Sequence, residues 1–450
     1  MPDLFERSVE RVPIVHLAPA KRNARTHSEA QIRQIAASME RFGVTNPALV
    51  DDDNRIIAGH GRVAAAKTLG HADFPCLRLS HLSEAEKRAY VLADNKLALN
   101  AGWDKELLAI DLRELAELQF DVSLTGFTLP EVDIILAEAD DAAPNGDDPG
   151  EDPPPSPAAA GPAATRLGDL WVLGRHRLLC GDAKDNAAIT LLMDGGQADM
   201  LFTDPPYNVP IDGHVSGLGQ VRHREFAEGV GEMTASQFTA FLQETLGAAA
   251  SVCRDGAIAF VCMDWRHLQE LLAAGHAVFS ELKNLCVWNK TNAGMGTFYR
   301  SQHELVLVWK YGGAPHTNNF GLGDKGRYRT NVWTYAGANA FKAERLEELK
   351  LHPTVKPVAL VADAIRDVTN RGQVVLDVFG GSGTTLIAAQ KTGRSARLIE
   401  LDPGYCDVII RRWEKLTGKS ATLEGDGRTF EAIAASQNDT WTNASTGWAA

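Results

Sequence analysis

The chain has 450 residues, a net charge of -13, 44% apolar residues and 23% charged residues. This length predicts two or three globular domains, and the composition excludes a mainly disordered chain. No apolar run reaches the roughly 18 residues that span a bilayer, and the N-terminus lacks the apolar core of a signal peptide, so no membrane partner is expected.

The negative charge is unevenly distributed, which weakens it as an argument against a nucleic-acid partner. Residues 136–165 hold seven acidic residues and no basic residue, whereas the chain from Arg166 onward is nearly balanced. The segment from Lys283 to Arg329 is more basic than acidic. The cysteines form no C-x-x-C pair, which predicts buried thiols in a reducing cytoplasm and no metal site: Cys76, Cys180, Cys253, Cys262, Cys286 and Cys406.

The first 135 residues alternate helix and strand signals and predict a small α+β domain. Ser28 is a candidate N-cap for a helix that ends before Gly43. In chain order there follow strands at 48–50 and 55–58, the turn 59–62, a helix that ends at Leu69, a strand at 74–79 and two longer helices at 83–99 and 104–118.

A stretch rich in Pro, Ala, Gly and Asp, residues 136–165, separates this domain from the rest of the chain. Such a composition buries too little apolar surface to fold, so we expect an acidic, flexible linker. Residues 431–450 are small and polar, which predicts a loose tail.

Residues 166–430 predict an α/β domain with a parallel, doubly wound sheet, because apolar strands alternate with helices. The expected strands are 200–203, 257–262, 285–288, 305–309, 374–379 and 396–401. The expected helices are 235–250, 265–273, 357–368, 384–391 and 405–416.

The first chemical motif is Asp204-Pro205-Pro206-Tyr207, directly after a predicted strand. An exocyclic base amine becomes nucleophilic when acceptors hold both of its hydrogens, and a carboxylate and a rigid proline carbonyl are such acceptors. The aromatic ring offers a stacking face to an extruded base. The competing interpretation is a rigid turn with a structural Asp, but α/β sheets bind ligands at this end of their strands.

The second motif runs from Asp377 through Phe379, Gly381 and Gly383 to Thr384, as strand, glycine turn and helix. The glycines allow close approach of a ligand to the backbone. The turn lacks the Lys of a phosphate-binding loop, and it departs from the dinucleotide fingerprint. Glu400 ends the next strand, where an acid meets ribose hydroxyls in nucleotide-binding folds. Together the motifs predict an adenosyl-type donor beside a base amine, a reaction that depends on positioning.

These motifs resemble the DNA amino-methyltransferase family, with the catalytic motif before the donor motif as in its beta subgroup. The resemblance implies S-adenosylmethionine as cofactor, with Asp182 near the donor adenine, Asp377 at the methionine end and Glu400 at the ribose. His352-Pro353-Thr354-Val355-Lys356-Pro357 resembles the segment that opens the donor pocket. The remaining implied donor contacts are Thr354, Lys356, Pro357, Phe379, Gly381, Gly383, Thr384 and Asp402.

In this family an Asp at the first catalytic position usually accompanies adenine N6, and cytosine N4 is the alternative. Target recognition in double-stranded DNA is expected between Trp288 and Lys350. The candidate phosphate or base contacts, each also interpretable as a solvated loop charge, are Lys290, Arg300, Lys325, Arg327 and Arg329. Asn208 and His303 are interpreted as structural.

The N-terminal domain resembles the ParB/sulfiredoxin fold through Ile56-Ile57-Ala58-Gly59-His60-Gly61-Arg62. The resemblance implies that Gly59 and Arg62 bind nucleotide or DNA phosphate, and a structural salt bridge of Arg62 is the alternative. The reductase cysteine of sulfiredoxin is missing. A nucleotide effector and a homodimer are further implied partners. The alternatives to a DNA adenine methyltransferase are a partition-type DNA-binding protein with an inactive methylase half, and an RNA methyltransferase.

Overall fold

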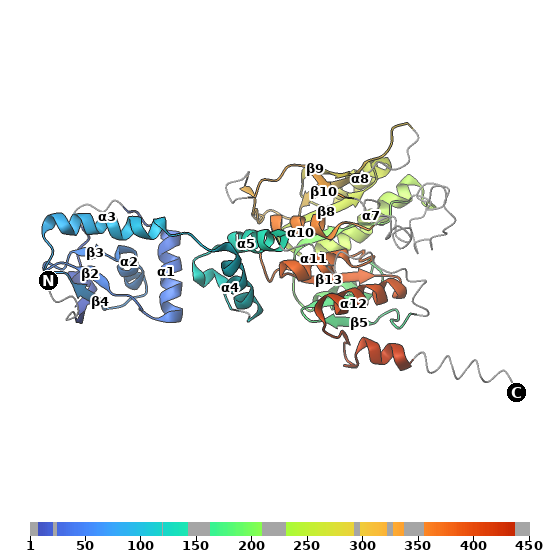
Figure 1. Cartoon of the computed structure of the whole chain (residues 1–450). Helices are drawn as coiled ribbons and strands as arrows, with labels where there is room; N and C mark the ends of the chain where they lie inside the picture. The colour runs from blue at the N-terminus through green and yellow to red at the C-terminus, as the bar shows by residue number, and fades with distance from the viewer. Residues whose placement is uncertain are drawn as a thin grey trace. The chain divides into compact units, whose positions relative to one another are not determined.

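The computed structural model describes residues 8–20, 25–118, 120–142, 163–208, 231–291, 298–321, 327–336 and 355–436. The chain divides into two compact units, Met1–Ala143 and Pro144–Ala450, and each is described by itself (Figure 1).

The first unit contains a four-stranded mixed sheet with helices, as expected for a ParB-like domain. Its strands lie in the order β1-β4-β2-β3. Helix α1 begins after Ser28, whose hydroxyl accepts the Gln31 N–H at 3.2 Å, and ends at Gly43 with φ 78°. The elements are β1 (Val9–Pro13), α1 (Glu29–Phe42), β2 (Ala48–Val50), β3 (Ile56–Ala58), α2 (His60–Thr68), β4 (Asp73–Arg78), α3 (Glu84–Asn100), α4 (Lys105–Glu117) and α5 (Leu129–Ala142).

The second unit is built on a ten-stranded sheet in the order β11-β9-β10-β8-β7-β12-β13-β6-β5-β14. Its strands are β5 (Leu170–Leu173), β6 (His176–Cys180), β7 (Ala198–Thr203), β8 (Cys253–Met263), β9 (Glu281–Lys290), β10 (His303–Lys310), β11 (Val332–Tyr335), β12 (Val374–Asp377), β13 (Ser395–Glu400) and β14 (Thr422–Leu423). Its helices are α6 (Asn186–Met193), α7 (Ala235–Ser251), α8 (Leu268–Val278), α10 (Val358–Val368), α11 (Thr384–Thr392) and α12 (Pro403–Thr417).

Helices cover both faces of this sheet, so the doubly wound α/β prediction is confirmed. Side chains of α10, α11 and α12 pack into one apolar core with alternate strand residues. Side chains of α6, α7 and α8 pack into a second core with the others. The central strands are buried along almost their whole length, which explains why their sequences are unbroken runs of apolar residues.

The sheet is mixed, whereas the sequence predicted a parallel one. Strands β8, β7, β12, β13 and β6 are parallel neighbours. Strand β10 is antiparallel to β8 and β9, and β5 is antiparallel to β6. Short connections such as the Gly174 turn between β5 and β6 can join only antiparallel strands.

Two expected boundaries differ in the structure. Ala164 and Thr165 are buried, and their N–H groups donate to the Asp407 carboxylate at 2.8 and 3.0 Å. These two residues therefore belong to the C-terminal unit and not to the linker. The predicted loose tail begins with a helical segment to Ser436, where Ile433 is buried in the core. The later residues of the tail lie outside the described ranges.

All six cysteines are buried free thiols, as predicted. Among the helices that the structure describes, none is long and apolar enough to cross a membrane.

Candidate active site

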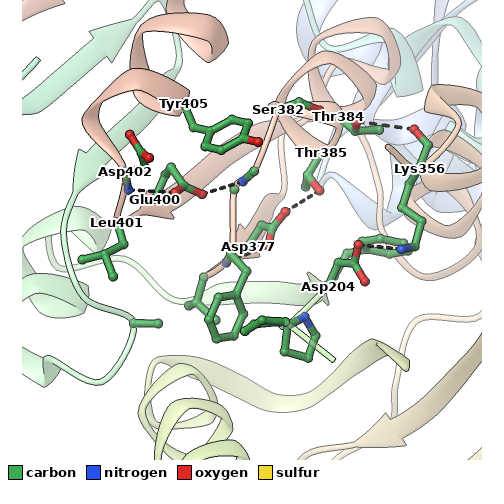
Figure 2. A pocket seen from close by; sticks show the side chains of 18 of the residues that line it. Asp204, Lys356, Asp377, Ser382, Thr384, Thr385, Glu400, Leu401, Asp402 and Tyr405 are labelled. Atoms are coloured by element: carbon green, nitrogen blue, oxygen red, sulfur yellow. Dashed lines mark hydrogen bonds and ion pairs between the residues drawn. The ribbon is translucent and has the colours of Figure 1, made fainter. Parts of the chain in front are cut away.

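The carboxyl ends of four parallel strands open into one pocket. Asp204 follows β7, Asp377 ends β12, Glu400 ends β13, and Asp182 follows β6. Because these strands are neighbours in the sheet, residues far apart in the chain line the same cavity. In Figure 2, Asp402 and Glu400 lie at one end, Asp204 and Lys356 at the other, and Asp377 between them. The lining includes Gly181, Asp182, Asp204, Pro205, Pro206, Tyr207, Phe241, Lys356, Asp377, Phe379, Gly381, Thr384, Glu400, Asp402 and Tyr405.

Glu400 is fixed at one end of the pocket by backbone donors. Its Oε2 accepts the Gly381 N–H at 2.7 Å and its Oε1 accepts the Asp402 N–H at 2.9 Å. Burial raises the pKa of Glu400 to about 7, against these stabilising hydrogen bonds. A carboxyl group so placed can accept hydrogen bonds from a ligand's hydroxyls.

The two glycines after β12 have different surroundings. Gly381, with φ 50°, lines the pocket, and a Cβ there would make only an ordinary contact, 3.9 Å from the Phe379 carbonyl oxygen. Gly383, with φ 85°, is the N-cap of α11, and a Cβ there would lie 3.0 Å from Ile409 Cγ1. Gly383 is absent from the pocket lining, so its structural role is to bring α11 against α12. The expected contact of Gly383 with the donor stays a prediction beside this packing role.

Asp377 lies at the centre of the site and is held by three donors. Its carboxylate accepts the hydroxyls of Thr385 at 2.6 Å and Thr203 at 3.2 Å. It also accepts the N–H of Phe379 at 3.1 Å. Burial raises the pKa of Asp377 to about 7. Phe379 packs near Phe241, with ring centroids 6.0 Å apart, and forms part of the apolar wall.

Asp204 lies at the other end of the pocket, in a compact cluster of polar side chains. Its Oδ1 accepts the Tyr207 hydroxyl at 2.6 Å, and its Oδ2 accepts the Lys356 ammonium at 2.5 Å. Burial raises the pKa of Asp204, Lys356 opposes this, and Glu304 reinforces it. The Asp-Pro-Pro-Tyr segment thus presents one carboxylate and one ring at the strand end, as its sequence predicts.

Glu304 is a member of this cluster that sequence reasoning missed. Its Oε2 lies 2.9 Å from Lys356 Nζ, and its Oε1 pairs with Lys290. Burial would raise the pKa of Glu304, but Lys356 and Lys290 lower it to about 2. The signal in the sequence was a single acid near the start of an otherwise apolar strand.

Arg327 and Arg329 correct the expected DNA-contacting set. Both guanidinium groups are largely buried and pair with two carboxylates on one face of α10, Asp363 and Asp367. Arg329 also donates to the Tyr335 hydroxyl at 3.1 Å. Both arginines therefore have carboxylate partners within the protein, and neither is a free cation available to DNA.

The remaining residues expected to contact DNA or the donor have different environments. Lys290 pairs with Glu304 at the site and lies 4.7 Å from the centroid of the Trp288 ring. Arg300 is exposed beside the exposed aromatic residues Phe298 and Tyr299. Pro357 is the N-cap of α10 and does not line the pocket. Thr354 and Lys325 lie outside the described residues.

The remaining predicted residues are Asn208 in the C-terminal unit and the candidate phosphate-binding residues Gly59 and Arg62 in the N-terminal unit. The Asn208 side chain accepts from the N–H groups of Gly231 and Met233, which fits its structural interpretation. Gly59 has φ 97° and precedes α2, and a Cβ there would lie 3.1 Å from Arg62 Nη2. Within the described part of the chain, Arg62 forms no ion pair, so the alternative interpretation as a structural salt bridge is not supported, and its phosphate contact stays a prediction.

Three family models match this chain. A DNA methylase model matches residues 198–411, a ParB N-terminal domain matches 3–96, and a ParB-methyltransferase HTH domain matches 106–167. The last match extends across the whole of residues 136–165, the range expected as a linker.

Individual proteins also match parts of the chain. The ParB-like nuclease domain-containing protein YnaK of Escherichia coli K12 is 46% identical over 76 residues, 17% of this chain and 87% of that protein. The type II methyltransferase M2.MboI of Moraxella bovis is 24% identical over 231 residues, 49% of this chain and 81% of that protein. A solved putative DNA modification methylase of Thermus thermophilus, complexed with S-adenosyl-L-methionine, is 21% identical with a TM-score of 0.37, over 54% of this chain and 96% of that chain.

The chain is thus a DNA methyltransferase joined to ParB-type domains. Residues 198–411 form a domain of the DNA N6/N4 methylase family, and ParB-type domains precede it in the chain, as the sequence motifs predicted. S-adenosylmethionine is its cofactor. The pocket suits this ligand chemically, because carboxyl groups at Asp182, Glu400 and Asp402 can accept from ribose and base donors beside an apolar wall.

Proposed function

We propose that the chain methylates the N6 amine of adenine at a specific sequence in double-stranded DNA. The observation that carries this proposal is the shared pocket of Asp204 and the Glu400–Gly381 pair. One end holds a carboxylate suited to an amine, and the other holds acceptors suited to an adenosyl group. S-adenosylmethionine supplies an electrophilic methyl group between them.

Asp204 has acceptor capacity left for the amine. A carboxylate offers about four lone-pair positions, and the Tyr207 and Lys356 donors occupy two of them. A second amine hydrogen would be accepted by a carbonyl of Pro205 or Pro206, neither of which has a competing N–H. Holding both hydrogens localises the nitrogen lone pair for in-line attack, so the contribution of these residues is positioning.

Asp204 is also the group to which we assign the proton released after transfer. The methylated nitrogen bears a positive charge until one N–H bond breaks and its electron pair returns to nitrogen. Burial raises the pKa of Asp204, which suits the carboxylate to accept that proton. Because Asp204 is only 26% exposed inside a pocket, a base stacked in a duplex cannot reach it, and we infer that the target base is extruded.

We assign the donor contacts according to the position of each residue in the pocket. Glu400 receives the ribose hydroxyls, Asp182 and Asp402 lie towards the base of the donor, and Asp377 faces its methionine end. Gly381, Phe379 and Thr384 form the surface on which the donor lies.

Nucleoside analysis tests the choice of base. Duplex DNA is incubated with the protein and isotopically labelled donor, digested to nucleosides and resolved by mass spectrometry. We expect label in N6-methyladenine. Label in N4-methylcytosine would replace the adenine assignment by its alternative, and label only in RNA offered in parallel would reject DNA as the substrate.

A further inference from the structure

The ammonium group of Lys356 is enclosed by three acceptors. Its Nζ lies 2.5 Å from Asp204 Oδ2, 2.9 Å from Glu304 Oε2 and 3.0 Å from the Tyr207 hydroxyl oxygen. A lysine has three N–H donors, so this arrangement satisfies all of them. The side chain is only 5% exposed, which means that water cannot replace a lost partner easily.

Aromatic rings and a second lysine complete this enclosure. The Lys356 ammonium lies 5.4 Å from the centroid of the Tyr207 ring and 5.8 Å from that of Trp288. Lys290 pairs with the other oxygen of Glu304. Two ammonium groups thus balance two carboxylates, which a buried cluster requires in order to keep all four groups charged.

Lys356 faces away from the donor end of the pocket. Its backbone carbonyl accepts the Thr384 hydroxyl at 3.4 Å, on the side of the glycine turn, whereas its ammonium points to Asp204 (Figure 2). The main chain of this residue therefore borders the donor half, and its charge belongs to the amine-binding half.

Resting on the function proposed above, we propose that Lys356 is a positioning residue for the target amine and not a donor contact: Glu304 and Tyr207 hold its ammonium, and that ammonium fixes the orientation of the Asp204 carboxylate. Glu304 affects Asp204 indirectly, because it pairs with Lys356 through one oxygen and with Lys290 through the other. The carboxylate is then aligned before the base arrives, which lowers the entropic cost of reaching the reactive geometry.

The same arrangement decides the charge state of Asp204. The charged or titratable groups around it come from several elements: Glu304 on β10, Lys290 on β9, Cys262 on β8, Asp377 on β12, and Tyr207 and Lys356. Burial raises the pKa of Asp204, Lys356 lowers it, and Glu304 raises it. Removing Lys356 and removing Glu304 therefore shift the ionisation of Asp204 in opposite directions.

The test compares K356M and E304Q in the full-length protein, with donor affinity and the pH profile of single-turnover transfer as readouts. The acidic limb of the profile is the pH range in which the transfer rate rises as Asp204 ionises. In K356M we expect this limb to move to higher pH by about one unit or more, with donor affinity within about twofold of the original protein. In E304Q we expect the acidic limb to move to lower pH. Because Lys356 is less firmly held there, the plateau rate also falls.

The control is K283M, which removes an exposed lysine whose partner is Glu281 at 3.0 Å. It makes the same change of charge outside the site and leaves both readouts unchanged. An acidic limb that stays in place in K356M, or a loss of donor affinity of about tenfold or more, would overturn the proposal. So would limbs that move in the same direction in K356M and E304Q.

If K356M does not fold, K356R tests the positioning role of Lys356 instead. Arg keeps the positive charge but cannot reproduce three convergent donors, so we expect an unchanged acidic limb and a plateau rate lower by about tenfold or more. A full plateau rate in K356R would contradict a positioning role. Failure of the proposed function is distinguishable, because the nucleoside analysis of the original protein would then show no label in N6-methyladenine, whatever the Lys356 variants do.

Discussion

The backbone N–H of Gly381 donates a 2.7 Å hydrogen bond to Oε2 of Glu400, which joins the glycine turn after β12 to the end of β13. This bond orients the carboxyl group across the pocket and leaves part of its acceptor capacity directed into the cavity. A local glycine motif and a distant acid thus act as one unit.

Substituting Glu400 tests the donor end of the site. In E400A we expect S-adenosylmethionine to bind about tenfold to a hundredfold more weakly, because hydrogen bonds to a charged acceptor are lost. Isothermal titration calorimetry measures this change. The control is E424A, which removes an acid that pairs with Arg177 outside the pocket. Equal donor affinity in E400A and the original protein would remove Glu400 from the donor site.

The raised pKa values of Glu400 and Asp377 predict a pH dependence. Both lie at about 7 in the folded protein, above ordinary values of 4.5 and 3.8. Because the folded-state values are raised, these groups contribute most to stability at low pH, and the contribution is lost as pH rises from about 4 through 7. Denaturation of E400Q without donor, compared with the original protein between pH 5 and 8, should show a shallower decline.

Donor hydroxyls favour the ionised form of Glu400, so donor binding should strengthen with pH up to about 7 and release protons. Calorimetry at about pH 6.5 in two buffers of different ionisation enthalpy measures the proton release. Donor affinity that is constant over this pH range, with no proton released, would contradict an ionised Glu400 in the complex.

The cluster around Arg329 predicts a loss of stability without a change in DNA binding. Removing Arg329 leaves Arg327 as the remaining partner of the buried Asp367 while Arg327 also pairs with Asp363, so the site carries excess negative charge, and R329M should lower the free energy of unfolding by about 3 kcal/mol. Urea denaturation measures it. The exposed Arg300 gives the opposite expectation: R300M keeps the stability and reduces the salt dependence of DNA binding by about one unit of slope. A reduced slope in R329M with full stability would restore Arg329 as a DNA contact.

The division of the chain predicts that the C-terminal unit retains methyl transfer. Every described residue of the pocket lies in this unit. A fragment of residues 163–450 keeps Ala164 and Thr165, which satisfy the buried Asp407, and we expect measurable transfer to duplex DNA. Complete loss in a fragment that remains folded by circular dichroism would make the N-terminal unit part of the active enzyme.

The sequence predicted what depends on local pattern. The Asp204 motif and the glycine turn were recognisable because each lies at a strand end within a few residues. Glu304 was not recognisable from the sequence, because its partners Lys290 and Lys356 lie in distant segments and because its own strand has the apolar pattern of a core strand. The two buried arginines were misinterpreted for the same reason: Asp363 and Asp367, at i and i+4 on α10, became partners only in the fold. Strand direction at the sheet edges also depends on pairing between distant segments.

The central claim is that Asp204 binds the target amine beside the donor, and one variant tests it most directly. D204A is compared with the original protein for transfer of labelled methyl groups to duplex DNA and, separately, for S-adenosylmethionine affinity. We predict that transfer is abolished while donor affinity stays within about twofold, because Asp204 lies at the end of the pocket opposite Glu400. Undiminished transfer by D204A would contradict the account.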